Sequence, residues 1–180
     1  NALRFLAFLS VFISHVALFL GYTSITPYFD FIKKFFLIHG DLGVSFFFVL
    51  SGFLITYLLF GEKDAFGEIS LSRFYMRRMF RILPPYILTI LLGFFIIYPI
   101  ALYSGISFPF LTAESYTDLP WYIFFVANMK IAMYGAGSAV LAVLWAISFE
   151  GQFYLIWPII VSSLSKKNFT KMLLLIIGIS

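Results

Sequence analysis

The sequence contains no cysteine and few charged residues. The absence of thiols excludes disulfide bridges, thiol nucleophiles and zinc–thiolate sites within these 180 residues. Charged side chains make up only 11% of the sequence, whereas hydrophobic residues make up 62% and aromatic residues 22%. Soluble domains are close to half apolar and a quarter charged. The composition therefore predicts an all-α membrane protein whose partner is the lipid bilayer.

Several apolar runs approach or exceed the roughly eighteen residues that a spanning helix needs. They predict a polytopic transmembrane helix bundle of about five spans and the start of a sixth, at residues 2–21, 42–60, 83–103, 120–134, 140–164 and 172–179. Residues 29–38 carry two lysines among Phe and Ile, which suits a helix lying on the membrane surface. Because proline is tolerated in the first turn of a helix, Pro84 and Pro85 are expected to mark the start of the third span.

The basic residues predict which loops face the cytoplasm. Five of them lie between the second and third predicted spans, and none lies between the third and fourth. Cytoplasmic loops are enriched in Lys and Arg, so the N-terminus is placed in the cytoplasm. Lys166, Lys167 and Lys171 would fall outside if the fourth and fifth spans both crossed, so either the short fourth span is re-entrant or this cluster breaks the rule. Because the basic residues set topology, the net charge of +4 indicates no nucleic-acid partner.

Arg4 and His15 lie on one face of the first predicted span. They are eleven residues apart, which is three turns plus about 20°, or roughly 16 Å along the axis. Burying them unpaired would cost several kcal/mol. His15 is either a hydrogen-bonding residue that holds the bundle together or a general base near neutral pH. Arg4 either snorkels to the membrane surface or clamps a phosphate or carboxylate.

Four arginines are concentrated just before the third predicted span. A helix would place Arg73, Arg77 and Arg81 on one face, with Arg78 beside Arg81. This stretch is either the positive flank of a span or a polyphosphate site, because guanidinium groups contact phosphates bidentately.

Two carboxylates lie within or at the end of predicted spans. Glu150 lies inside the fifth predicted span and needs a partner or a proton. It either fixes helix packing, or it orients His15 or contacts a sugar hydroxyl. Asp41 lies at the outer mouth of the second predicted span and is either an ordinary interfacial polar residue or part of a site. Gly43 is expected to permit close helix approach. The sequence shows no metal-ligand spacing, phosphate-cradling glycine loop or serine-hydrolase elbow, so no metal is expected.

Four motifs follow one another in order through nearly the whole chain. They are Leu3-Arg4-x10-His15, Gly43-Val-Ser-Phe-Phe-Phe-Val-Leu-Ser-Gly-Phe-Leu-Ile55, Phe74-x-x-Arg77-Arg78-x-x-Arg81-Ile-x-Pro84-x-Tyr86 and Leu144-Trp-x-x-Ser-x-Glu150-x-Gln152-Phe-Tyr-Leu-x-Trp-Pro158. In these motifs the chain resembles the membrane acyltransferase-3 family, integral-membrane enzymes that O-acylate cell-surface polysaccharides and related glycans. It departs from the family at Ser45, where Asp is frequent, and at Gly151, where a second Glu is frequent.

The resemblance implies one membrane-embedded acyltransferase domain over residues 1–180, as the N-terminal half of a protein with about ten spans in a bacterial inner membrane. It implies a cytoplasmic acyl-CoA donor, usually acetyl-CoA, and a carbohydrate or glycolipid acceptor at the outer face. His15 is then the candidate base or transient acyl carrier, with Glu150 orienting it or contacting the acceptor. The candidate donor-binding residues are Arg4, Arg77, Arg78 and Arg81, and the candidate substrate-binding residues are Asp41, Gln152 and Tyr154.

Two other classes of function use the same buried charges. A proton-coupled transporter or a glycolipid translocator would also place His, Glu and Arg inside the membrane. A non-catalytic membrane subunit would use these side chains only to hold its helices together. Consumption of acyl-CoA without net solute movement distinguishes the enzyme from the transporter.

Overall fold

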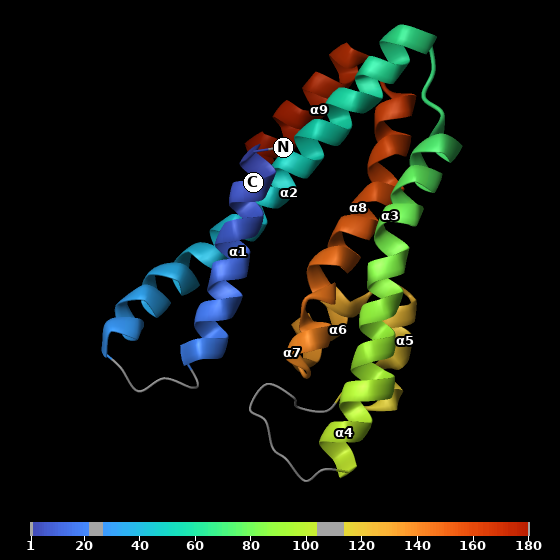
Figure 1. Cartoon of the computed structure of the whole chain (residues 1–180). Coiled ribbons are helices and arrows are strands. Elements are labelled where there is room, and N and C mark those ends of the chain that lie inside the picture. The colour runs from blue at the N-terminus through green and yellow to red at the C-terminus, as the bar shows by residue number, and fades with distance from the viewer. Residues whose placement is uncertain (1, 22–26, 104–113, 180) are drawn as a thin grey trace. The chain divides into compact units, whose positions relative to one another are not determined.

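A computed structural model describes residues 2–21, 27–103 and 114–179. Within these ranges the secondary structure is helical, as predicted, with no strand element. The elements are α1 (Ala2–Gly21), α2 (Pro27–Phe66), α3 (Leu71–Leu91), the π-helix η1 (Leu92–Ile97), α4 (Tyr98–Tyr103), the 3-10 turn η2 (Tyr116–Asp118), α5 (Leu119–Ile123), α6 (Ala127–Tyr134), α7 (Ala139–Ala142), α8 (Leu144–Ser163) and α9 (Lys166–Ile179) (Figure 1). The chain divides into two units, residues 1–62 and 63–180.

Three helical segments within the described ranges are long and apolar enough to cross a membrane. They are Leu42–Phe66, Leu71–Ile100 and Ala139–Ser163, and they correspond to the second, third and fifth predicted spans. The first predicted span coincides with α1, a helix of 20 residues. The chain is therefore a helical membrane protein.

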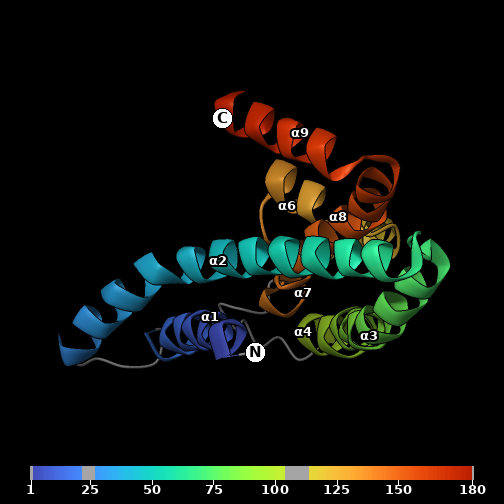
Figure 2. The same ribbon diagram turned by 90° about the horizontal axis from the view of Figure 1, so that it is seen from above.

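In the first unit, α1 packs closely against α2 at Gly43. A Cβ atom at Gly43 would lie 3.0 Å from the Val11 side chain and 3.2 Å from the Ala7 carbonyl oxygen, so the absence of a side chain permits this approach. The small residue predicted to allow close helix packing is confirmed. Residues 29–38 are not a separate helix, because α2 runs unbroken over 40 residues (Figure 2).

The predicted start of the third span at Pro84 and Pro85 is wrong, because both prolines lie inside α3. The helix begins at Leu71, so that only residues 67–70 connect α2 to α3. Arginine, methionine and leucine before the prolines are strong helix formers, so the arginine-rich stretch is helical, as predicted. Helices in membranes tolerate proline because neighbouring groups satisfy the carbonyls that it leaves free.

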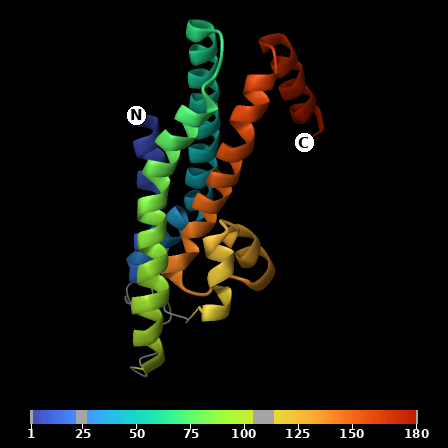
Figure 3. The same ribbon diagram turned by 90° about the vertical axis from the view of Figure 1, so that its right-hand side faces the viewer.

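The predicted fourth span at 120–134 is not one helix. It consists of α5, with 5 residues, and α6, with 8 residues, separated by a break at residues 124–126. A crossing needs about 20 residues, so neither helix reaches across a bilayer. Figure 3 shows this yellow segment beside the C-terminal half of α3 and the N-terminal half of α8. Of the two alternatives for this segment, the structure therefore favours re-entry.

The helices α3 and α8 run antiparallel through the second unit. Tyr75 on α3 donates to the Leu155 carbonyl on α8. About three turns further along α3, Tyr86 meets Ser148, which lies about two turns before Leu155 on α8. As residue numbers rise along α3 they therefore fall along α8. A buried apolar core forms at the far end of this pair, where α5–α7 pack against it: Tyr86, Ile90, Phe94, Tyr122, Ala127, Leu141 and Leu144.

One end of the α3–α8 pair, the basic end, collects most of the positive charge. Lys63 donates to the carbonyls of Ser162 and Leu164 at the C-terminus of α8, at 2.8 and 3.0 Å. Lys166 pairs with Asp64 at 2.6 Å. These contacts place the lysines that follow α8 on the same side as the arginines of α3. Eight of the twelve basic residues thus lie at this end or within about three turns of it, and the conflict with the positive-inside rule disappears.

A buried ion pair fixes the segment at the opposite end. The Lys130 ammonium donates to Glu114 and lies 3.8 Å from Asp118. The Tyr122 hydroxyl donates to Glu114 at 2.9 Å, and the Ser138 backbone N–H donates to the same oxygen at 3.3 Å. The side chains of Lys130 and Glu114 are only 6% and 1% exposed. One carboxylate therefore joins α5, α6 and the turn before α7.

The surroundings of Glu114 keep it ionised. Burial raises its pKa, but the hydrogen bonds from Lys130 and Tyr122 and the lysine charge outweigh burial, so the pKa is lowered. A Cβ atom at Gly137 would lie 2.4 Å from the carboxylate, so glycine makes room for it.

Replacing Lys130 with Met should destabilise the protein by about 3–5 kcal/mol, because it leaves Glu114 buried without its counter-ion. The matched control is Lys166→Met, which breaks the pair with Asp64 where both side chains are more than half exposed. That change should cost no more than about 1 kcal/mol. Thermal or denaturant unfolding in detergent measures both. Equal effects would show that the Lys130 pair is not a buried anchor.

Single cysteines test the position of the basic end. Glu68→Cys and Lys167→Cys, in a cysteine-free version of the full-length protein, should react with a membrane-impermeant maleimide from the same side. Tyr103→Cys, at the other end of the α3–α4 helix, should react from the opposite side. Labelling of positions 68 and 167 from different sides would contradict re-entry of α5–α6.

Candidate functional site

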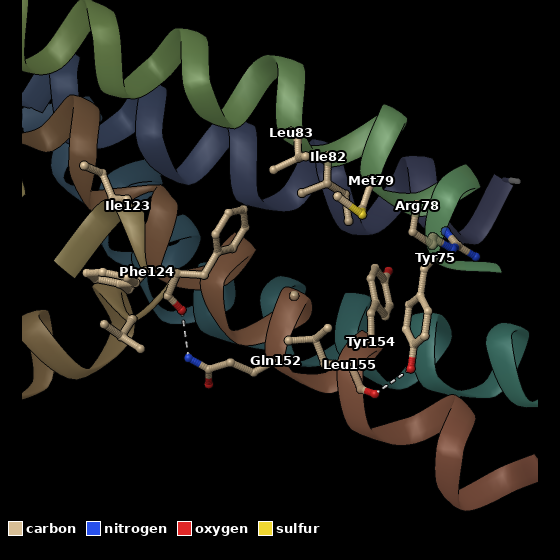
Figure 4. A pocket seen from close by; sticks show the side chains of 13 residues that line it. Tyr75, Arg78, Met79, Ile82, Leu83, Ile123, Phe124, Gln152, Tyr154 and Leu155 are labelled. Atoms are coloured by element: carbon tan, nitrogen blue, oxygen red, sulfur yellow. Dashed lines mark hydrogen bonds between the residues drawn. The ribbon is translucent and has the colours of Figure 1, made fainter. Parts of the chain in front are cut away.

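A cavity of about 430 Å³ lies between α3, α8 and the α5–α6 break (Figure 4). Its walls are mainly apolar, with a few polar side chains from the basic half of α3 and the middle of α8. The lining residues are Tyr75, Arg78, Met79, Ile82, Leu83, Ile123, Phe124, Phe125, Val126, Gly151, Gln152, Tyr154 and Leu155. A predominantly apolar pocket with few polar groups is typical of a small-molecule site.

Arg78 is the arginine of α3 that lines this cavity. Its guanidinium carbon lies 5.1 Å from the centroid of the Tyr154 ring and 5.6 Å from that of Phe74. These cation–π contacts hold a half-buried cation beside an apolar space. Arg77 and Arg81, the other two predicted donor-binding arginines of this helix, are exposed. Helical spacing explains the difference, since one step along α3 turns a side chain by about 100°.

Tyr154 connects Arg78 to Glu150. Its ring faces the guanidinium, and its hydroxyl donates to Glu150 Oε1 one turn earlier on α8. Glu150 is half-buried and does not itself line the cavity. The hydrogen bond fixes the orientation of the carboxylate and gives it one of the partners that a charge inside a spanning helix needs. The predicted site residues Arg78, Tyr154 and Glu150 are thus brought together.

Gln152 uses its amide to hold the α5–α6 break. Its Nε2 donates to the Phe125 carbonyl at 2.9 Å and to Asn128 Oδ1 at 3.0 Å. Asn128 Nδ2 donates back to Gln152 Oε1 at 3.1 Å. Both ends of the amide are therefore bonded within the protein. Gln152 borders the cavity, as its predicted substrate-binding role requires, but its contacts are those of a residue that positions the cavity wall.

Phe125 is the one non-glycine residue with positive φ, at 58°, in the part of the chain that the structure describes. Its ring stacks on Tyr86, with centroids 3.9 Å apart and planes 14° from parallel. The Tyr86 hydroxyl donates to the Tyr122 carbonyl at 2.7 Å and lies 3.2 Å from Ser148 Oγ. The left-handed backbone costs an L-residue about 1–2 kcal/mol, which these contacts offset.

Sequence reasoning missed Phe125 and Asn128 as parts of the site. A polar Asn in a short apolar run was the available signal, because a buried amide needs hydrogen-bond partners. No sequence signal marks Phe125, because Phe is not a residue that favours positive φ.

The remaining predicted site residues belong to the first unit. Arg4 and His15 lie on α1 and Asp41 lies on α2, and their side chains are outside the described parts of the structure. Within the described residues, no group of three His, Cys, Asp or Glu side chains could hold a metal ion.

Truncating Gln152 to Ala should destabilise the protein by about 1–3 kcal/mol, because it leaves the Phe125 carbonyl unpaired in an apolar environment. Asn128→Ala should cost less, and the double variant should cost clearly less than the sum, with a coupling of about 0.5–3 kcal/mol. Unfolding in detergent measures this double-mutant cycle. Strict additivity would show that the two amides do not act together.

Comparison with known proteins confirms the resemblance found in the motifs. The family model described as Acyltransferase domain matches residues 1–180. O-acetyltransferase OatA of Staphylococcus aureus is 32% identical over 128 residues, which cover 69% of this chain and 21% of that protein. Peptidoglycan O-acetyltransferase OatA of Listeria monocytogenes is 30% identical over 149 residues, which cover 78% of this chain and 23% of that protein.

The chain aligns with less than a quarter of the length of these relatives. No solved structure matches it. The family match nevertheless extends over all four motifs, including those that contain the cavity-lining residues Arg78, Gln152 and Tyr154. This chain therefore belongs to the acyltransferase-3 family of membrane acyltransferases.

Proposed function

We propose that the protein to which this chain belongs is an integral-membrane O-acetyltransferase. It takes an acetyl group from acetyl-CoA on the cytoplasmic side and transfers it to a hydroxyl of a cell-envelope carbohydrate, such as peptidoglycan or a lipid-linked polysaccharide. The observation that carries the proposal is the half-buried Arg78 at an apolar cavity, next to the Tyr154–Glu150 pair. Family membership and two relatives named as O-acetyltransferases support it.

The basic end supports donor binding on the cytoplasmic side. Eight basic residues gather there, and cytoplasmic ends of membrane proteins are enriched in Lys and Arg. Arg78 has the planar, always charged group that binds phosphate bidentately, and Arg4, Arg77 and Arg81 are the further candidates for the donor phosphates. In this orientation the protein lies in a bacterial inner membrane with its N-terminus in the cytoplasm.

The proposed chemistry is attack of an acceptor hydroxyl on a thioester. Acetyl-CoA, when bound, supplies the acetyl group as that thioester. His15 takes the proton from the acceptor hydroxyl while the hydroxyl oxygen forms the new ester bond to the acetyl carbon. The carbon–sulfur bond of the thioester breaks, and the proton passes from His15 to the sulfur of CoA. Glu150 orients His15 or holds the acceptor, with its own orientation fixed by Tyr154. Asp41 is the further candidate for the acceptor. If His15 carries the acetyl group transiently, the same bonds form and break in two steps.

The test is acetyl-CoA turnover by the full-length protein in membranes, with a peptidoglycan or polysaccharide acceptor. His15→Ala should lower kcat by at least about a hundredfold, because it removes the general base. Arg78→Gln should raise the KM for acetyl-CoA by about tenfold or more, the effect of losing a charge-assisted hydrogen bond.

Lys167→Gln is the control, because it removes an exposed positive charge from the same end of the molecule outside the proposed site. It should leave both constants unchanged at matched expression. Normal transfer by His15→Ala would rule out its role as base, and no turnover by the wild type would overturn the proposed function.

A further inference from the structure

A second cavity, of about 370 Å³, continues from the first along α3. Leu83, Ile123 and Phe125 line both cavities. The second is otherwise lined by residues nearer the end of α3 that is opposite the basic end: Tyr86, Ile87, Ile90, Leu91, Phe95 and Leu119. The two cavities therefore meet where the α5–α6 break faces α3.

Together the cavities extend along most of the candidate span Leu71–Ile100, which α3 and η1 form with the start of α4. From Tyr75 to Phe95 the helix advances by 20 residues, or about 30 Å. The hydrocarbon core of a bilayer has a similar thickness. Arg78 stands at the basic end of this space, and the Phe95 ring lies 6.2 Å from that of Tyr116 at the other. The apolar space thus leads from the charged end of the molecule to the opposite end.

Phe125 stands at the junction and is held there from three sides. Its ring stacks on Tyr86 of α3, and its carbonyl accepts a hydrogen bond from Gln152 of α8. On the third side, a Cβ atom at Gly151 would lie 3.2 Å from Phe125 Cδ1, so the absence of a side chain at Gly151 leaves space for the ring.

We propose that Phe125 closes the far end of the acyl-binding cavity and so selects the acyl group by chain length. The inference rests on the proposed function, in which the donor phosphates bind at the basic end and the acyl group enters the first cavity beside Arg78. The apolar walls accept the hydrocarbon part of an acyl group, and the ring at the junction of the cavities limits how long that part can be. An acetyl group fits on the Arg78 side of the ring, whereas a longer straight chain would need the space that the ring closes off. Phe125 is thus a specificity-determining residue.

Phe125→Gly is the sharpest variant, because glycine keeps the positive φ of the break without strain while the ring is removed. The experiment compares acetyl-CoA, butyryl-CoA and hexanoyl-CoA as donors for the full-length protein in membranes. Removing the ring should raise the ratio of kcat/KM for butyryl over acetyl by at least about tenfold, the discrimination expected for one or two methylene groups.

Two further variants separate selectivity from folding. Phe125→Leu retains an apolar side chain and should raise the ratio by less, so that it reports on size even where Phe125→Gly is poorly expressed. Phe80→Ala removes a ring from α3 that is 73% exposed and lines neither cavity, and it should leave the ratio at the wild-type value. Thermal unfolding of each variant shows that the ratio is measured on folded protein.

The outcomes distinguish the two proposals. A wild type that turns over none of the donors overturns the proposed function. A wild type that transfers acetyl, with an unchanged butyryl-to-acetyl ratio in both Phe125 variants, overturns the role of Phe125 in selecting chain length and leaves the proposed function in place. A change in the rates for all donors by one common factor would also overturn this role of Phe125, since a merely structural role lowers turnover without changing the preference between donors.

Discussion

Two backbone carbonyls at the α5–α6 break are the constraint on which the second unit depends. In apolar surroundings an unpaired carbonyl costs several kcal/mol, so a helix can be interrupted there only if other groups supply donors. Tyr86 of α3 donates to the Tyr122 carbonyl, which also accepts from the Phe125 N–H, and Gln152 of α8 donates to the Phe125 carbonyl. Each long helix therefore bonds one carbonyl of the break, and the break is fixed between them.

The shape of the cavity follows from this arrangement. With the break held by α3 and α8, the side chains of Ile123 and Phe125 form one wall, and Arg78 and Tyr154 from the two helices form the opposite end. The amide and hydroxyl groups that build the wall use their hydrogen bonds on the protein itself. Arg78 itself lines the cavity, and Glu150 is connected to it through the hydroxyl of the lining residue Tyr154.

The two ends of the α3–α8 pair handle charge differently. At the basic end, exposed cations face outward and Lys63 caps the last carbonyls of α8. At the other end, Lys130 is buried and neutralised internally by Glu114. The proposed orientation uses this asymmetry, because a cation that is already paired and buried does not bias orientation as an exposed cluster does.

The amino-acid sequence by itself determined the helical membrane class, the location of three long apolar helices and the family, because long apolar runs and ordered motifs are local properties of the chain. It also identified Arg78, Glu150, Gln152 and Tyr154 as candidates. Pro84 and Pro85 gave a wrong boundary, since proline is a reliable stop only where no neighbour satisfies the carbonyls it frees. Only the tertiary structure decided that residues 120–134 break rather than cross, that Arg78 and not Arg77 borders the cavity, and that Gln152 holds Phe125. These outcomes depend on hydrogen bonds between residues more than twenty positions apart, and no local pattern in the sequence specifies them.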